Sequence, residues 1–192
     1  MGFQQHPTAL VESDTIGDGT RIWAFAHVLA GAVIGRDCNI GDHCYIESGA
    51  VIGDAVTIKN GVAVWDGVAI ERGAFVGPNA TLTNDRRPRS REPWRLSRTQ
   101  IEEGATIGAN ATVLPGITVG AFSMVAAGAV VTRDVPAHAV VVGNPARVRG
   151  QVCRCGHPLL RRRNRHVCSE CQREFVIRGA RLVEAARASD AT

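Results

Sequence analysis

An aliphatic residue recurs at every sixth position along most of the chain, and this period constrains the fold more than any other feature. Counted from residue 10, thirteen consecutive positions in steps of six hold Ile, Val or Leu, where composition alone would give about three. These positions are Leu10, Ile16, Ile22, Val28, Ile34, Ile40, Ile46, Ile52, Ile58, Val64, Ile70, Val76 and Leu82. After an interruption the series resumes, shifted by one residue, at Ile101, Ile107, Val113, Val119, Val125 and Val131.

A period of six fits neither an α-helix nor a flat, two-sided strand. It fits a solenoid in which each hexad forms one short strand and one corner, and three hexads close a triangular coil around the aliphatic side chains. The nineteen hexads then form about six coils, and the prism is about 30 Å long because stacked strands lie about 4.8 Å apart. We therefore predict an all-β protein in which residues 1–150 form a parallel β-helix.

Two further positions of the hexad follow from the same geometry. A small residue precedes most aliphatic positions by two, and Cys38 and Cys44 occupy this slot. We therefore predict that both thiols are buried core residues. A glycine often follows the aliphatic position directly, as at Gly17, Gly35 and Gly53, and we expect it to relax the backbone there.

Residues that lie 18 apart stack on the same face of such a prism. One row contains Ser48, Asp66 and Asn84, and the adjacent row contains Glu47, Trp65 and Thr83. Another row contains Phe25, His43, Gly61 and Asn79. Polar and aromatic side chains therefore gather on one corner of the middle coils, beside the point where the repeat is interrupted.

The interruption, residues 83–100, contains two prolines and six arginines and cannot continue the coil. A loop of this length inside a compact fold is usually functional. The planar guanidinium of Arg matches phosphate and carboxylate groups, so Asp85, Arg86 and Arg89 are candidates for binding an anionic ligand. A solvated basic loop without a ligand is the alternative.

The composition changes after residue 150, where four cysteines form two close pairs. Cys153 and Cys155 are separated by twelve residues from Cys168 and Cys171, and this spacing resembles a zinc ribbon with four thiolates around one structural Zn²⁺. The first pair is C-x-C instead of the commoner C-x-x-C, so His157 or His166 could replace one ligand. We predict a zinc-ribbon-like module over residues 151–178 and a short helix or a tail over 179–192.

Several motifs in residues 6–150 resemble the sugar-nucleotide N-acetyltransferases of the hexapeptide-repeat superfamily. They are His6-Pro-Thr-Ala, Arg21-Ile-Trp23-Ala-Phe25-Ala-His27, Val64-Trp65-Asp66-Gly67, and the run from Val76-Gly77-Pro78-Asn79 through Asn84-Asp85 to Pro88-Arg89. The resemblance implies a left-handed coil and a homotrimer with active sites between subunits. It also implies acetyl-CoA in the groove between subunits and a nucleotide sugar beside the loop.

The resemblance leaves two substrates open, both of them 3-amino sugars. We favour UDP-2-acetamido-3-amino-2,3-dideoxy-glucuronate, a precursor for surface polysaccharide, and the alternative is a dTDP-3-amino-3,6-dideoxyhexose. In this family the Asn at the position of Asn84 orients the amine. A sugar amine should have a pKa near that of an α-amino group, about 7.7–8.0, so no strong base is needed and positioning can supply most of the rate.

The remaining candidate residues follow from their places along the repeat. His43 is the candidate for a general base, whereas His27 fits a subunit seam better. Glu47, Trp65 and Asp66 lie on the rows that lead to Asn84 and are candidates for binding the sugar. For the phosphates of CoA we consider Arg133 and the turn that contains Asn144, Pro145 and Arg147.

The charge distribution tests one competing interpretation, nucleic-acid binding. The net charge of +4 divides into −5 over residues 1–82, +4 over 83–100, −2 over 101–146 and +7 over 147–192. The run from Arg161 to Arg165 is a fair electrostatic footprint for nucleic acid. Between Trp94 and Phe175, however, Phe122 is the only aromatic residue, so base stacking is poorly supplied and we expect no nucleic-acid partner.

Two other competing interpretations concern the fold itself. A non-catalytic scaffold would not need the loop at Asn84. A γ-type carbonic anhydrase would need three histidine ligands between subunits, and His27 and His43, which are sixteen residues apart, do not supply them.

The N-terminal residues lack the features of a signal peptide, and no apolar run approaches the ~18 residues of a membrane span. We therefore expect a cytoplasmic location without a membrane partner.

Overall fold

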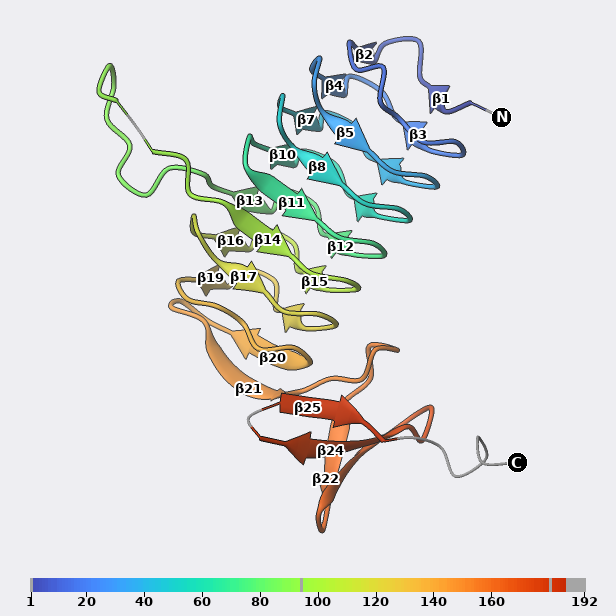
Figure 1. Ribbon diagram of the computed structural model, residues 1–192, viewed down its shortest axis with the longest axis vertical. Coiled ribbons are helices and arrows are strands. Elements are labelled where there is room, and N and C mark those ends of the chain that lie inside the picture. The colour runs from blue at the N-terminus through green and yellow to red at the C-terminus, as the bar shows by residue number, and fades with distance from the viewer. Residues whose placement is uncertain (1, 94, 180, 186–192) are drawn as a thin grey trace.

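The computed structural model describes residues 2–93, 95–179 and 181–185. These residues form 25 strands and no helix, and none of them therefore forms a helix long and apolar enough to cross a bilayer. Figure 1 shows a stack of coils that carries a long loop on one side and a small separate sheet at its C-terminal end. The predicted parallel β-helix is confirmed.

Three sheets form the sides of the prism, and from β3 to β19 each sheet collects every third strand. The first contains β1 (Gln4–Gln5), β3 (Arg21–Ile22), β6 (Asn39–Ile40), β9 (Thr57–Ile58), β12 (Phe75–Val76), β15 (Thr106–Ile107), β18 (Met124–Val125), β20 (Ala139–Val142) and β21 (Arg147–Gln151). The second contains β2 (Leu10–Val11), β4 (His27–Val28), β7 (Tyr45–Ile46), β10 (Ala63–Val64), β13 (Thr81–Leu82), β16 (Thr112–Val113) and β19 (Val130–Val131). The third contains β5 (Val33–Ile34), β8 (Val51–Ile52), β11 (Val68–Ile70), β14 (Thr99–Ile101) and β17 (Thr118–Val119).

The core follows the six-residue repeat with one exception at the N-terminus. The aliphatic positions from Ile22 onward are buried, and the thiols of Cys38 and Cys44 lie in the same core, as predicted. Leu10 is instead 54% exposed. Because Val11 pairs with Val28, the first coil is one residue shorter than the others, and the inward position moves from Leu10 to Val11.

The glycines that follow the aliphatic positions have a different role from the one expected. Positive φ angles occur at the corners, for example at Gly31, Gly49 and His43, and not at Gly17, Gly35 or other glycines of this series. A Cβ on Gly35 would lie 2.6 Å from the backbone carbon of Gly53 in the next coil. These glycines therefore permit the close stacking of coils and do not supply unusual backbone angles.

The loop is inserted into one coil without disturbing the stack. Ile70 pairs with Ile101 across β11 and β14, although 31 residues separate them, and Ile101 then pairs with Val119 at the normal spacing. The backbone N–H of Ser97 donates to the carbonyl of Asn84 (3.0 Å), which closes the base of the loop.

The C-terminal module, residues 152–185, is an antiparallel sheet of β22 (Leu159–Arg162), β23 (Arg165–Cys168), β24 (Glu174–Arg178) and β25 (Arg181–Glu184). A short helix or a tail was expected from residue 179, but residues 181–184 form the fourth strand of this sheet. Residues 186–192 lie outside the described part of the chain.

A buried histidine attaches the module to the last coil. The His138 ring stacks on Phe122 at 5.4 Å between centroids and meets Phe175 of the module edge-on at 5.0 Å. Its Nδ1 lies 2.9 Å from the carbonyl oxygen of Val152, so Nδ1–H donates this hydrogen bond. Burial lowers the pKa of His138, which keeps the ring neutral between the two phenyl groups.

Candidate active site and metal centre

The turns that follow β4, β7, β10 and β13 stack into one corner, here called the Asn84 corner, and the predicted sugar-binding residues meet there. The backbone N–H of Asp66 donates to the Glu47 carboxylate (2.8 Å), and the Asn84 amide donates to the carbonyl of Asp66 (3.2 Å). All three residues are half-buried. Hydrogen bonds from coil to coil therefore hold the Asn84 amide at the surface, where one of its N–H groups and its oxygen remain available.

Aromatic rings lead along the second sheet to this corner. Trp65, which is half-buried, lies 5.5 Å from Tyr45 between ring centroids, and Tyr45 lies 5.7 Å from His27. The Nε2 of His27 contacts the Glu12 carboxylate at 2.9 Å. We did not single out Tyr45 from the sequence, although its place 18 residues after His27 was the available signal.

The loop begins with contacts that fix its first residues against the prism. The Asp85 carboxylate accepts the backbone N–H of Arg87 (2.9 Å), and the Arg86 guanidinium donates to the carbonyl of Pro115 (3.2 Å) in a neighbouring coil. Leu96 packs so closely over Gly67 that a Cβ there would approach it within 2.8 Å. Arg89 is exposed and donates to the carbonyl of Pro88. Asp85 and Arg86 therefore border the Asn84 corner, whereas Arg89 lies further out on the loop.

His43 lies at another corner of the prism, the His43 corner, formed by the turns after β3, β6, β9 and β12. It has a φ of 57° and stacks on Phe25 at 5.0 Å with an interplanar angle of 15°. Its ring is exposed. The predicted row of Phe25, His43, Gly61 and Asn79 is present, but a single chain does not bring His43 to the corner that carries Asn84.

The two arginines proposed for CoA line one cavity at the last coil. This cavity has a volume of about 130 Å³ and is bordered by Arg133, Asp134, Arg147 and Val148, and a separate, larger cavity of about 410 Å³ lies on the third sheet. The Asp134 carboxylate accepts the N–H of Thr118 (2.9 Å), so part of its charge is already engaged. Asn144 and Pro145, joined by a cis peptide bond, precede Arg147 but do not line the cavity.

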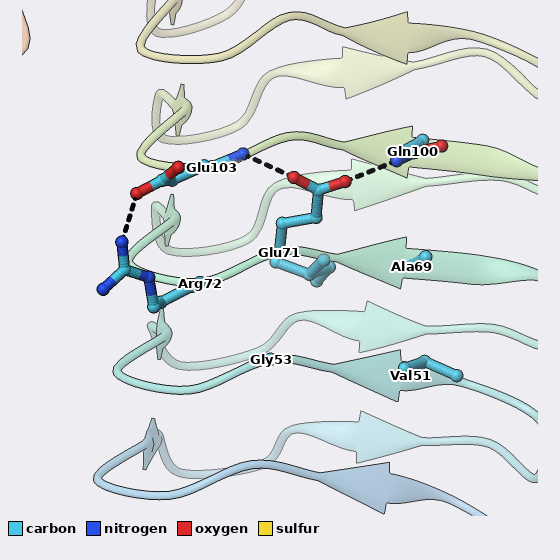
Figure 2. A pocket seen from close by; sticks show the side chains of 8 residues that line it. Val51, Gly53, Ala69, Glu71, Arg72, Gln100 and Glu103 are labelled. Atoms are coloured by element: carbon cyan, nitrogen blue, oxygen red, sulfur yellow. Dashed lines mark hydrogen bonds and ion pairs between the residues drawn. The ribbon is translucent and has the colours of Figure 1, made fainter.

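The larger cavity contains none of the predicted site residues. It lies over β8, β11 and β14, with Val51 and Ala69 on its floor. In Figure 2 the Glu71 carboxylate accepts from the Gln100 amide (2.5 Å) and from the backbone N–H of Glu103 (3.1 Å). Arg72 pairs with Glu103 at 2.6 Å. The polar groups of this cavity thus satisfy one another.

The four cysteines of the C-terminal module converge in a geometry that suits a metal ion. The sulfur atoms of Cys153, Cys155, Cys168 and Cys171 all lie within 4.8 Å of one another. Contacts of 3.4 Å (Cys155–Cys168), 3.5 Å (Cys155–Cys171) and 3.6 Å (Cys153–Cys171) approach the edge of about 3.8 Å in a tetrahedral Zn–S₄ site. Neither His157 nor His166 belongs to this group.

Within this cluster, hydrogen bonding favours the thiolate form at Cys171, whereas burial raises the pKa of the Cys153 thiol to about 12. The backbone N–H of Arg173 lowers the pKa of the Cys171 thiol to about 6, and the Arg173 guanidinium lies 3.4 Å from the same sulfur. His157 lies 3.7 Å from the Cys155 sulfur through Nδ1. Burial also raises the pKa of the core thiol of Cys44 to about 11, so that thiol stays protonated.

A parallel β-helix with a polar corner interrupted by one long loop is an architecture of hexapeptide-repeat transferases. The family model described as bacterial transferase hexapeptide (six repeats) matches residues 15–48, 49–84 and 98–133. The chain belongs to this family, and it is an acyltransferase.

One relative and two solved structures indicate which members of the family resemble the chain. The dTDP-3-amino-3,6-dideoxy-alpha-D-galactopyranose 3-N-acetyltransferase of Aneurinibacillus thermoaerophilus is 49% identical over 171 residues, 88% of each chain. A hexapeptide-repeat acetyltransferase of Vibrio cholerae O1 biovar eltor, solved with acetyl coenzyme A, is 29% identical with a TM-score of 0.54 over 63% of this chain and 70% of that one. The acetyltransferase domain of PglB from Neisseria gonorrhoeae FA1090 shares the fold. It is 23% identical with a TM-score of 0.56, and the match covers 77% of this chain and 57% of that one.

Proposed function

We propose that the protein transfers the acetyl group of acetyl-CoA to the 3-amino group of a dTDP-linked 3-amino-3,6-dideoxyhexose. The observation that carries this proposal is the 49% identity to the Aneurinibacillus enzyme over 88% of both chains. That substrate is the alternative considered above, and it replaces the favoured UDP-linked glucuronate. Acetyl-CoA and nucleotide sugars are cytoplasmic metabolites, so the same proposal places the protein in the cytoplasm.

The Asn84 corner supplies positioning more than acid–base strength. The Asn84 amide, held by the carbonyl of Asp66, would accept through its oxygen a hydrogen bond from an N–H of the sugar amine and so align the amine lone pair with the thioester carbon. The new C–N bond then forms as the C–S bond breaks, and the ammonium proton passes to the departing thiolate. Glu47 and Asp66 would bind sugar hydroxyl groups, and Trp65 would stack on a ring.

The arginines have separate proposed ligands because they lie at different places on the prism. Arg86, beside the Asn84 corner, and Arg89 on the loop would bind the diphosphate of the nucleotide. Arg133 and Arg147, which line one cavity at the last coil, would bind phosphates of CoA, with the turn at Asn144 and Pro145 shaping that end of the groove.

His43 can act as a base only if another subunit brings it to the Asn84 corner, since one chain places the two residues at different corners. A homotrimer would supply this arrangement. The row of Val33 and Val51 on the third sheet is 38% and 47% exposed, and outward aliphatic side chains of this kind favour burial against a neighbouring subunit. We propose this row as part of the subunit contact.

The cysteine cluster is proposed to hold a structural zinc ion. Four thiolates leave no open coordination position for substrate or water, so the ion would stabilise the module and would take no part in acetyl transfer. Its ligands would be Cys153, Cys155, Cys168 and Cys171.

A substrate comparison tests the proposed function. Release of CoA thiol is measured with acetyl-CoA and either dTDP-3-amino-3,6-dideoxygalactose or the UDP-linked 3-amino glucuronate. We expect turnover with the dTDP sugar and at least about a hundredfold lower kcat/KM with the UDP sugar, whose carboxylate and different base alter several contacts at once. Equal or reversed preference would contradict the proposed substrate, and no thiol release with either sugar would contradict acetyl transfer to amino sugars.

A further inference from the structure

One face of the C-terminal sheet carries both arginines and aliphatic side chains. Leu159, Cys168 and Phe175 are buried on one side of the sheet. Strand alternation therefore places Leu160, Arg162, Val176, Arg178 and Val183 on the other side, here called the open face, together with the ion pair of Arg165 and Glu174. Leu160 is 47% and Val183 38% exposed, and Arg162 and Arg178 are exposed. Figure 1 shows the sheet beyond the last coil, away from the Asn84 corner.

The positive charge of the module is only partly neutralised. Residues 152–185 contain eight arginines and three glutamates. Glu184 pairs with Arg154 and Arg173, and Glu174 pairs with Arg165. Among the described residues, Arg161, Arg162, Arg163 and Arg178 form no ion pair with an acidic side chain. The excess charge therefore lies at one end of the sheet, around the turn between β22 and β23 and at the end of β24.

The combination of charge and exposed aliphatic groups selects the class of partner. A nucleic acid would bind the arginines through phosphates, but single-stranded binding relies on exposed aromatic rings, and the one aromatic residue of the module, Phe175, is fully buried. A phosphate backbone also offers no apolar surface against which Leu160 and Val183 could be buried. A lipid surface with anionic headgroups offers phosphates for arginine and an apolar interior for aliphatic side chains.

We propose that the open face is a docking surface for a membrane that contains anionic phospholipids. Arg162 and Arg178, together with Arg163 at the adjacent turn, contact the headgroup phosphates, and Leu160 and Val183 enter the boundary between headgroups and acyl chains. The protein binds at the surface without crossing the bilayer, and the proposal therefore departs from the expectation of no membrane partner.

Sedimentation with vesicles tests this surface on the full-length protein. Vesicles of phosphatidylcholine with phosphatidylglycerol should bind the wild type, and this binding should weaken as salt increases. The double variant Arg162→Glu/Arg178→Glu should reduce the partition coefficient by about thirtyfold or more, because each juxtamembrane arginine contributes about a fivefold factor. Leu160→Asp should reduce it by about tenfold through loss of the inserted side chain.

Matched controls separate docking from folding and from catalysis. The control Arg36→Glu/Lys59→Glu makes the same charge change at exposed positions of the prism and should bind vesicles like the wild type at equal ionic strength. All these variants should keep the wild-type kcat/KM for the soluble nucleotide sugar, which shows that the chain is folded. This activity readout also makes failure of docking distinguishable from failure of the proposed function.

Four binding outcomes would overturn the proposal, and one assembly outcome would do the same. The binding outcomes are equal binding to vesicles of phosphatidylcholine alone, undiminished binding of either open-face variant, an equal loss in the prism control, and a gel shift with duplex DNA or single-stranded RNA at physiological salt without vesicle binding. The last outcome would assign the open face to nucleic acid instead. Self-association through this face would appear as a change in sedimentation coefficient that Leu160→Asp abolishes in the absence of lipid, and without vesicle binding it would equally contradict the proposal.

Discussion

The prism and the C-terminal module achieve stability in opposite ways. The prism repeats one small unit many times, so its core is a continuous column of aliphatic side chains from Ile22 to Val141, and each coil contacts only its neighbours. Among the described residues, the buried cluster of the module contains Cys153, Leu159, Cys168 and Phe175, two of which are proposed metal ligands. A repeated core tolerates local damage, whereas a core of this size needs further stabilisation, which the proposed metal centre would supply.

The largest test of this contrast is removal of the metal. A zinc-selective chelator should unfold residues 152–185 while the prism stays folded, because binding energies of roughly 10 kcal/mol for structural zinc far exceed what the four buried residues can supply. Hydrogen exchange should then show lost protection in β22–β25 and retained protection in β7–β16. Cys168→Ser should have the same effect without chelator, and unchanged exchange in either case would contradict the metal centre.

The second test should strongly reduce acetyl transfer while the prism and the C-terminal module both stay folded. Asn84→Ala should lower kcat by about a hundredfold or more, since positioning by hydrogen bonds contributes several kcal/mol to such transfers. The loss of one hydrogen bond to Asp66 should cost only about 1 kcal/mol of stability. Asn39→Ala removes a comparable amide within the first sheet and outside both corners, whose oxygen accepts a hydrogen bond from the Trp23 indole (2.8 Å), and should retain activity. Full activity of Asn84→Ala would contradict the proposed site.

A third test measures how far damage spreads inside the repeated core. Ile52→Ala should lower the free energy of unfolding by about 3 kcal/mol, because Ile52 is 1% exposed between Ile34 and Ile70. Val51→Ala at the neighbouring outward position should cost much less in the isolated subunit. Thermal or denaturant unfolding followed by circular dichroism compares the two. Equal losses would show that the inward and outward positions have been assigned wrongly.

The smallest effect concerns the contact between the two regions and its dependence on pH. Burial lowers the pKa of His138 below its ordinary value of 6.5, so the undocked state binds more protons once the pH falls below that value. The docking free energy should therefore decrease as the pH falls from about 7.5 to 5.5, measured by hydrogen exchange at β20 and β21. His138→Phe should remove this dependence while keeping an aromatic ring between Phe122 and Phe175, and a dependence that persists in this variant would exclude His138 as its cause.

The same contrast explains which features could be predicted from the sequence. Each hexad of the prism has the same inward and outward positions. The burial of Ile40 or Cys44 and the stacking of Glu47, Asp66 and Asn84 could therefore be predicted from sequence position alone. Leu10 is exposed where the repeat predicts burial, because the first coil is one residue shorter than the others and no preceding coil constrains its register. The role of Gly35 was misjudged because the approach of two backbones in successive coils is not visible in a single hexad.

The module could be predicted only through its cysteines. Its strands have no period, and the pairing of β24 with β25 depends on cross-strand contacts such as Val176 with Val183, which local propensity does not specify. The positions of His43 and Asn84 at different corners likewise follow from counting along the coil, but their possible meeting between subunits depends on an assembly that one chain does not contain.

Because the rows of successive coils stack in register, the length of the prism changes in steps of one coil. Thr112 pairs with Val130 and Thr106 with Met124, in each case 18 residues apart, so deleting 18 consecutive residues between the loop and Arg133 would leave every row in register. It would also bring the Arg133 cavity closer to Asn84 by one strand spacing of about 4.8 Å. Under the proposed function, in which Arg133 binds a CoA phosphate and Asn84 orients the acceptor amine, the number of coils after the loop would set the length of acyl carrier that can span the two sites.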